Sequence, residues 1–316
     1  MRPLAFPLLL LSALTPTTST SSPRSCPAAP ALRDAPTQIA ESPPIFVFDV
    51  LFTAADADQL IALAKGSLRA AVTKDLAGNV HVDGGRAKGR DSDSTSLLPR
   101  ISSTPSSDDP VARFRSLMAN AALLPESHGE PLQVSRYRRG QRYEVHLDSS
   151  ATTPRLATVA AFLRTPAEGG ELAFPWASRG RFANVTVPGV RGRGRPATEL
   201  AAGPSDVSAA TVCAPAYDAL AIRPLVGRVV VWTNHDPQLR RRAYETLHAS
   251  CPVVSDDEKY IAQLWLRWHA VGERDEFGDV LRSVGLGEWR LAPPKLRSAA
   301  AGGGAERPQR EHHLAS

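Results

Sequence analysis

The sequence carries a short pattern of metal-ligand side chains, His146-Leu147-Asp148 and, far along the chain, His248. Two residues that are two positions apart on a strand point to the same face, because strand side chains alternate. A third ligand from a distant strand would complete a 2-His-1-carboxylate set, which holds Fe(II) on one side and leaves the opposite coordination positions open. A His-x-Asp triplet often arises by chance, so its surroundings must decide the interpretation.

Further short motifs flank these residues. In chain order they are Leu132-Gln133-Val134, Arg136-Tyr137, Gly140-Gln141, Tyr143-Glu144, Glu168-Gly169-Gly170-Glu171, Cys251-Pro252-Val253 and Lys259. Gly140 suits a tight turn that leads into the ligand strand. His235 is the other candidate for the third ligand, but it stands before Asp236-Pro237, which predicts a turn. The Cys-Pro-Val sequel therefore favours His248.

With these motifs the chain resembles the prolyl 4-hydroxylase alpha-subunit-like family of Fe(II)/2-oxoglutarate-dependent dioxygenases, from about Pro44 to Trp268. The resemblance implies a mainly β fold with flanking α-helices and a double-stranded β-helix (jelly-roll) core. It implies that His146, Asp148 and His248 are the catalytic iron ligands. It also implies 2-oxoglutarate and O2 as cosubstrates, with ascorbate as the reductant.

The same resemblance assigns residues to the cosubstrate and the substrate. Lys259 is expected to pair with the distal carboxylate of 2-oxoglutarate, and Tyr137 to donate a hydrogen bond to it. Arg155 and Trp265 match positions near the substrate. Alternate positions from Lys259 to Trp265 share one face of an expected strand, so both can point into the barrel. A lysine buried there needs an anionic partner, because an unpaired buried charge is costly.

The function that the resemblance implies is hydroxylation of peptidyl proline in proline-rich secretory proteins, as by procollagen-proline 4-dioxygenases. Polyproline II segments suit a peptide groove because their backbone is extended and has no internal hydrogen bonds. Ser149 follows Asp148 where the family usually has an aromatic residue, and Leu172 stands where a threonine is common. Two alternatives therefore remain: a dioxygenase of this fold that acts on another residue or a small molecule, and a non-catalytic peptide-binding module.

The elements that must position these residues are short. Apolar spacing predicts one helix from an N-cap at Thr53 to about Gly66, and a second that starts at Asp109-Pro110. Strand-like runs cover residues 45–50, 133–137, 142–147, 156–163, 171–174, 219–222, 228–232 and 260–268. Many short strands without intervening helices predict a sandwich or barrel. The polar segment 74–110 predicts a long loop.

Composition divides the chain into segments. We expect a signal peptide or short signal anchor over 1–22, a Pro/Ala/Ser-rich flexible stalk over 23–43, the dioxygenase domain over 44–270 with an irregular insertion at 177–216, and a largely disordered extension over 271–316. No later segment is apolar for long enough to span a bilayer, so no multi-pass membrane protein is expected. The leader predicts the secretory pathway, with the lumen of the endoplasmic reticulum or Golgi as the expected location.

Two covalent features fit an oxidising lumen. Cys213 and Cys251 are the expected disulfide pair, with two buried free thiols as the alternative. Asn184 begins an Asn-x-Thr glycosylation sequon.

The formal net charge of +5 comes largely from the arginine runs at 191–195 and 240–242, which predict solvated loops. Basic residues do not alternate with aromatic ones, so no nucleic-acid partner is expected. The expected partner is a proline-rich peptide or protein, and the sequence does not fix an oligomeric state.

Overall fold

The computed structural model describes residues 35–71, 82–83, 86–87, 89–100, 109–150, 153–194, 207–235 and 243–271, all within one compact unit that begins at Leu32. The predictions for the leader, for residues 23–34 of the stalk and for the extension beyond Val271 lie outside these residues. Within the described ranges, no helix has the length and apolar character needed to cross a membrane.

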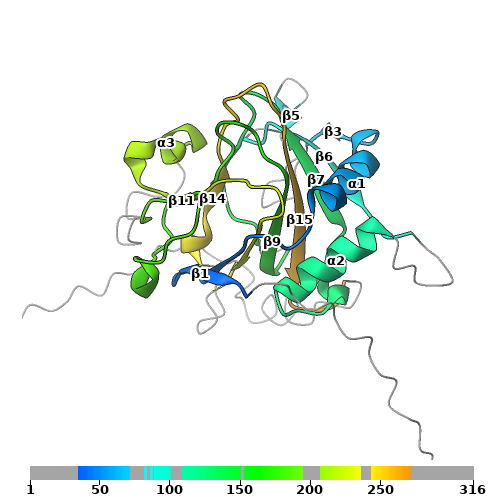
Figure 1. The fold of residues 1–316 in the computed structure, drawn as a ribbon, viewed down its shortest axis with the longest axis horizontal. Helices are drawn as coiled ribbons and strands as arrows, with labels where there is room; N and C mark the ends of the chain where they lie inside the picture. Colours follow the sequence, from blue (N-terminus) through cyan, green and yellow to red (C-terminus); the bar gives the residue numbers. More distant parts are fainter. Residues whose placement is uncertain are drawn as a thin grey trace, which may run out of the picture. The chain divides into compact units, whose positions relative to one another are not determined.

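Two antiparallel sheets form the body of this unit (Figure 1). The eight-stranded sheet has the order β1 (Thr37–Ala40), β2 (Ile45–Phe48), β13 (Val229–Thr233), β9 (Arg155–Arg164), β15 (Lys259–Arg267), β7 (Leu132–Tyr137), β6 (Asp93–Leu97) and β3 (Arg69–Ala70). The five-stranded sheet has the order β11 (Val190–Arg191), β12 (Leu220–Ile222), β10 (Leu172–Phe174), β14 (His248–Ser250) and β8 (Tyr143–His146). The short strands β4 (Val82–Asp83) and β5 (Arg86–Ala87) pair with each other.

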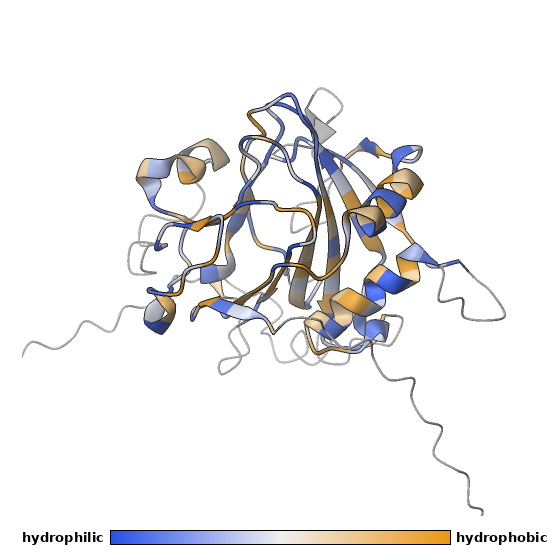
Figure 2. Ribbon diagram, viewed as in Figure 1, coloured by the Kyte–Doolittle hydropathy of each residue, from blue (hydrophilic) through white to orange (hydrophobic). Residues whose placement is uncertain are grey.

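One face of the eight-stranded sheet is covered by helices α1 (Ala54–Lys65) and α2 (Pro110–Ala121), which pack on β9 and β15 (Figure 1). Both helices start as predicted: Thr53 forms a capping box with Asp56, and the Asp109 side chain accepts a hydrogen bond from the backbone N–H of Val111. Figure 2 shows hydrophobic and hydrophilic residues interleaved along both helices. Their apolar faces join alternate residues of the sheet, such as Val159 and Leu264, in one core.

The other face of the eight-stranded sheet meets the five-stranded sheet. Phe162, Trp232 and Ile261 from the larger sheet pack in one buried cluster with Phe174 and Ile222 from the smaller sheet. Because strand side chains alternate, β9 and β15 supply this core and the helix-facing core from opposite faces. The predicted jelly-roll fold, mainly β with flanking helices, is confirmed.

Short elements fill the connections. They are the 3-10 helices Glu126–His128, Gly180–Phe182, Pro215–Tyr217 and Tyr244–Thr246, and helix α3 (Ala209–Cys213). The predicted irregular insertion at 177–216 contains short ordered elements, among them Gly180–Phe182, β11 and α3. Residues 195–206 of the insertion lie outside the described ranges.

Two predictions about the chain's layout need correction. Residues 37–40, which composition assigned to the stalk, form β1, and Ile39 and Ala40 are fully buried. Residues 93–97, which polarity assigned to a long loop, form β6, which pairs with β7 and, at its start, with β3. β6 lies next to the edge of the sheet and is only partly buried, so it needs no alternating apolar pattern.

Candidate metal centre

The three expected metal ligands meet where β8 ends and β14 begins. The antiparallel register pairs His248 directly with His146, and Asp148 follows two residues after β8 ends. The Nε2 atom of His146 lies 3.7 Å from Oδ1 of Asp148, and Nε2 of His248 lies 3.5 Å from Oδ2. The three candidate ligand atoms all lie within 4.8 Å of one another.

Hydrogen bonds determine which ring nitrogens face the centre. Nδ1 of His146 lies 2.8 Å from the carbonyl oxygen of Glu144, and Nδ1 of His248 lies 2.9 Å from that of Thr246. A carbonyl can only accept, so each Nδ1 carries the hydrogen and each Nε2 offers a lone pair. Both Nε2 atoms are buried without a hydrogen-bond partner among the described residues. Two such nitrogens beside a carboxylate fit a divalent iron ion.

The electrostatics of the cluster favour the metal-binding protonation states. Burial alone would raise the pKa of the Asp148 carboxyl, but the charge of His248 and the contact with His146 hold it well below its usual range. Burial lowers the pKa of His248 to about 4, and the neighbouring His146 acts in the same direction. At neutral pH the cluster therefore offers an ionised carboxylate and a neutral imidazole, as metal binding requires.

Aromatic rings fix the orientation of both imidazoles. The ring of Tyr143 stacks on His146 with centroids 3.6 Å apart. His248 contacts Trp232, at 4.9 Å, and Phe174, at 5.6 Å, from the core between the sheets. Rotation of either imidazole would require these packed rings to move.

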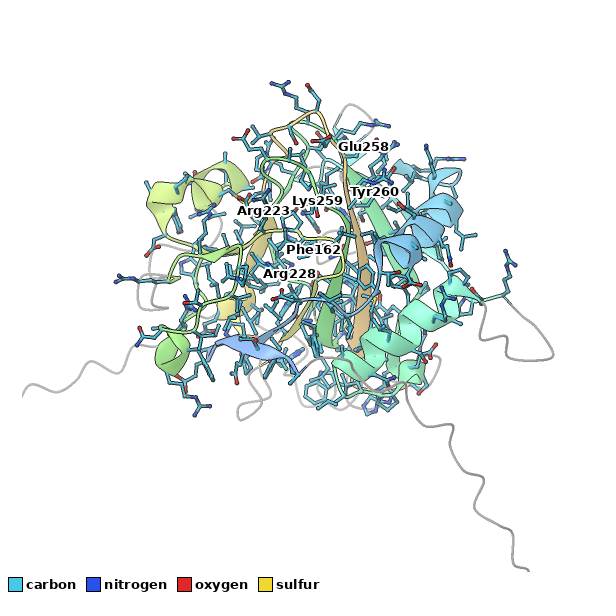
Figure 3. The ribbon with its side chains drawn as sticks, viewed as in Figure 1. Phe162, Arg223, Arg228, Glu258, Lys259 and Tyr260 are labelled. Carbon is cyan, nitrogen blue, oxygen red and sulfur yellow. A yellow bond between two sulfur atoms is a disulfide. The ribbon has the colours of Figure 1, made fainter. Side chains whose placement is uncertain are left out.

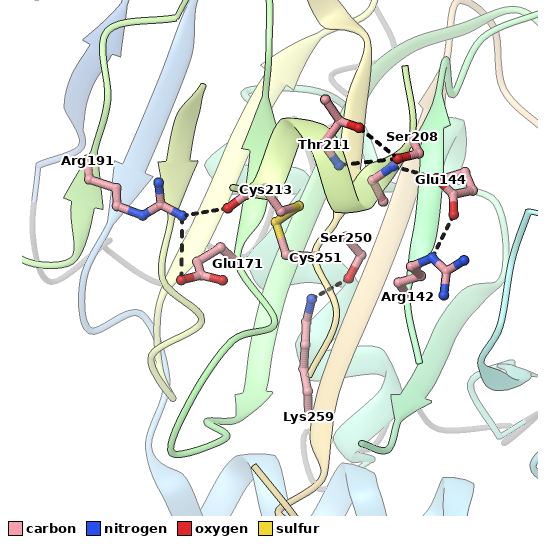
Figure 4. The surroundings of a disulfide bond; sticks show 11 residues. Arg142, Glu144, Glu171, Arg191, Ser208, Thr211, Cys213, Ser250, Cys251 and Lys259 are labelled. Atoms are coloured by element: carbon pink, nitrogen blue, oxygen red, sulfur yellow. Dashed lines mark hydrogen bonds and ion pairs between the residues drawn. A yellow bond between two sulfur atoms is a disulfide. The ribbon is translucent and has the colours of Figure 1, made fainter. Parts of the chain in front are cut away.

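Lys259 lies inside the barrel, 1% exposed, and donates a 2.6 Å hydrogen bond to Oγ of Ser250 (Figure 4). Figure 3 shows it in the interior near Phe162, and its Nζ lies 5.0 Å from the ring centre of Tyr137 on the paired strand β7. Burial lowers the pKa of Lys259 to about 7, although the charge of Glu171 partly offsets this effect. A buried ammonium group beside a hydroxyl and a phenol suits a small anionic ligand.

Arg155 and Trp265, the expected substrate contacts, lie against each other. The guanidinium carbon of Arg155 lies 3.9 Å from the ring centre of Trp265, and Nη1 donates to the backbone oxygen of Asp148. Nε and Nη2 of Arg155 donate to the two carboxylate oxygens of Glu130, which also accepts from Arg267. The arrangement places Arg155 and Trp265 beside the ligand cluster.

Sequence reasoning did not identify Ser250, Glu130 or Thr158 as parts of the site. Ser250 had a usable signal, because it stands two residues after His248 and so shares its face of the strand. Glu130 gave none, since it precedes β7 in a segment without periodicity. Thr158, which donates to Asp148, is one of many residues in an apolar strand.

The remaining predicted positions lie at the margins of the site. His235 is buried outside the ligand cluster, with Nε2 3.4 Å from Oγ of Ser149. Cys213 and Cys251 are joined in a disulfide (Figure 4). Asn184 is exposed, and its glycosylation stays a prediction.

Comparison with known proteins agrees with this geometry. Residues 132–267 match the family model described as 2OG-Fe(II) oxygenase superfamily. The chain is 29% identical over 238 residues to probable prolyl 4-hydroxylase 7 of Arabidopsis thaliana, covering 73% of this chain and 64% of the relative. Prolyl 4-hydroxylase 2 of the same plant is 28% identical over 237 residues, covering 72% of this chain and 69% of the relative.

Among solved structures, the chain is similar to the collagen prolyl hydroxylase of Paramecium bursaria Chlorella virus-1 in its 2OG complex. The sequence identity is 22% and the TM-score is 0.41, and the match covers 70% of this chain and 94% of that one. The fold, the ligand set and the family match define residues 132–267 as a 2OG-Fe(II) oxygenase domain. Within that superfamily the chain is similar to proteins named prolyl 4-hydroxylases. The predictions of family and enzyme class are confirmed.

Proposed function

We propose that this chain hydroxylates proline residues in peptides, using Fe(II), 2-oxoglutarate and O2. The observation that carries the proposal is the pairing of two features, one on each of the two sheets. The cluster of His146, Asp148 and His248 can hold iron, and the buried ammonium group of Lys259 can hold an anionic cosubstrate. Ser250 links the two features, because it shares β14 with His248 and accepts from Lys259.

Each side chain has a distinct task in this proposal. His146, Asp148 and His248 hold the iron and occupy one side of it. Lys259 and Tyr137 bind the distal carboxylate of 2-oxoglutarate and set its orientation. Iron, when bound, supplies the oxidative chemistry that couples decarboxylation of 2-oxoglutarate to hydroxylation of the substrate. The packed rings around His146 and His248 exclude water from that side of the centre.

The substrate class is a peptide with an extended, proline-containing segment. The relatives named prolyl 4-hydroxylases support this choice. Arg155 and Trp265 lie beside the ligand cluster, where the guanidinium can donate to backbone carbonyls and the indole can pack on a proline ring. Polyproline II segments leave their carbonyls free for such bonds. We also propose ascorbate as the reductant and a lumen of the secretory pathway as the location, which the disulfide supports.

The test is succinate formation from 2-oxoglutarate with Fe(II), ascorbate and a library of proline-rich peptides, with hydroxyproline measured by mass spectrometry. We expect peptide-stimulated succinate formation in the wild type and its loss in His146→Ala. His269→Ala is the matched control, since His269 is exposed and outside the ligand cluster.

The outcomes separate the alternatives. Succinate formation without hydroxyproline in any peptide would exclude the proline assignment and favour another substrate. Equal, negligible iron binding by the wild type and His146→Ala would instead favour a non-catalytic binding module.

A further inference from the structure

A chain of two buried hydrogen bonds ends on the metal-binding carboxylate. Oγ1 of Thr158 donates to Oδ2 of Asp148 over 2.8 Å, and Nδ2 of Asn234 donates to Oγ1 of Thr158 over 2.9 Å. Thr158 is 0% exposed and Asn234 is 1% exposed. Asp148 and Thr158 are 10 residues apart in the sequence, whereas Asn234 stands 76 residues after Thr158.

Main-chain pairing holds the two donors in place. Thr158 lies on β9 opposite Trp232 of β13, and Asn234 follows directly after β13. The backbone N–H of Asn234 donates to the carbonyl of Leu156 over 2.8 Å. The pairing of β9 with β13 therefore determines the separation of the two side chains.

The chemistry of the groups fixes the direction of the bonds. An ionised carboxylate can only accept, and the amide nitrogen of Asn234 can only donate. A hydroxyl has one hydrogen, so Thr158 gives it to Asp148 and accepts from Asn234. Without Asn234, the Thr158 hydroxyl would be free to turn toward another acceptor.

We propose that Thr158 and Asn234 are positioning residues for the metal site. By holding Oδ2 of Asp148, they fix the rotation of the carboxylate and favour ligation through a single oxygen. A carboxylate with both oxygens free can bind a metal through both, which would occupy a position that the cosubstrate needs. The inference rests on the proposed function, because it assumes that the His146, Asp148 and His248 cluster binds a metal.

The test uses Mn(II) alone as the probe, titrated into the metal-free full chain. Loss of an outer hydrogen bond to a metal ligand typically weakens metal binding 10- to 100-fold, and we expect that range for Thr158→Val. Thr158→Ser keeps the hydroxyl and should remain within about threefold of the wild type, whereas Asn234→Leu should show a smaller loss than Thr158→Val.

Thr233→Val is the matched control. It makes the same change from hydroxyl to methyl on β13, but the Thr233 hydroxyl is buried without a hydrogen-bond partner in the described part of the chain. Its Mn(II) affinity should equal that of the wild type. Thermal unfolding of each metal-free variant shows whether an affinity loss accompanies a loss of fold.

The results distinguish a failure of the proposed function from a failure of the positioning role of Thr158 and Asn234. Absence of Mn(II) binding by the wild type would overturn the proposed function itself. Tight binding by the wild type and an equal affinity in Thr158→Val would overturn the positioning role alone, as would a loss in Thr158→Ser as large as that in Thr158→Val. If Thr158→Val does not fold, wild-type affinity in a folded Asn234→Leu variant overturns the role.

Discussion

At the scale of single residues, the site depends on buried polar groups that have specific partners or are aimed at an expected ligand. The two imidazoles turn their Nδ1 atoms to backbone carbonyls and their Nε2 atoms to the centre. Lys259 has only the hydroxyl of Ser250 as a hydrogen-bond acceptor among the described residues. Such groups lower stability in the empty protein and gain a partner when the ligands bind.

The pKa of Lys259 predicts a pH dependence for cosubstrate binding. Burial lowers this pKa to about 7, with Glu171 as the opposing charge and Tyr137 and Ser250 as the other facing groups. Only the protonated amine pairs with a carboxylate, so binding above this pKa requires uptake of a proton. The dissociation constant for 2-oxoglutarate should be flat below about pH 7 and rise about tenfold per pH unit above it.

Calorimetric titration of the Mn(II)-loaded protein with 2-oxoglutarate over this pH range measures the effect. Lys259→Arg is the control, because a guanidinium stays charged throughout. We expect its affinity to be weaker but independent of pH. A parallel rise in both proteins would assign the dependence to another group.

At the scale of elements, the paired strands β8 and β14 bring the ligands together, and the short helix α3 packs against both strands. Residues next to the ligands in the sequence, such as Val145 and Ala249, pack against Ala209 and Val212 of α3. Glu144 on β8 accepts a hydrogen bond from the backbone of Ala209 at the start of α3. The disulfide then ties the end of α3 to the residue that follows β14.

Removing the disulfide should therefore destabilise the domain. The bond closes a loop with a sequence separation of 38 residues, for which chain entropy gives up to about 4 kcal/mol of the free energy of unfolding. The double variant Cys213→Ser/Cys251→Ser should unfold at a lower urea concentration than the wild type. Cys26→Ser, which leaves this bond intact, is the control, and equal midpoints for all three proteins would contradict the bracing role.

Gly169 marks a close approach between two loops next to the site. Its φ is +78°, and a Cβ there would lie 2.3 Å from the carbonyl oxygen of Pro252 and 2.8 Å from the backbone nitrogen of Val254. Gly169→Ala should lower the free energy of unfolding by more than about 1 kcal/mol, since backbone must move. Gly66→Ala, where nothing lies within 4 Å, should have a small or stabilising effect. Urea unfolding of both variants tests the contrast, which equal effects would contradict.

Some of the strands and helices could be predicted from the local sequence pattern, and others could not. Strand-like apolar runs correctly predicted strands such as β7, β9, β13 and β15, and cap residues located both long helices. The polar strand β6 and the three-residue strand β14 have no such pattern, because their neighbours in the sheets position them. Thr158 and Asn234 could not be predicted as a pair, since their contact depends on the register of β9 and β13.

At the scale of the whole molecule, the helices that stabilise the larger sheet and the residues of the metal site lie in different parts of the described unit. The helices cover one face of the eight-stranded sheet, and the ligand cluster lies on the side of the smaller sheet. This division explains why a motif could identify the chemistry while the substrate stays a proposal. His146 and His248 lie on paired strands and Asp148 follows one of them by two residues, whereas Arg155, Glu130 and Arg267, which share a hydrogen-bond network beside the ligands, come from three segments.

The most direct test of the account follows isotopically labelled O2 through a single reaction with Fe(II), 2-oxoglutarate and a proline-rich peptide. The account predicts that one labelled oxygen enters succinate and the other enters hydroxyproline of the peptide. Mass spectrometry of both products measures this directly. Labelled succinate together with a peptide that never carries the label would contradict the assignment to peptidyl proline, and unlabelled succinate would contradict dioxygenase chemistry at the His146, Asp148 and His248 site.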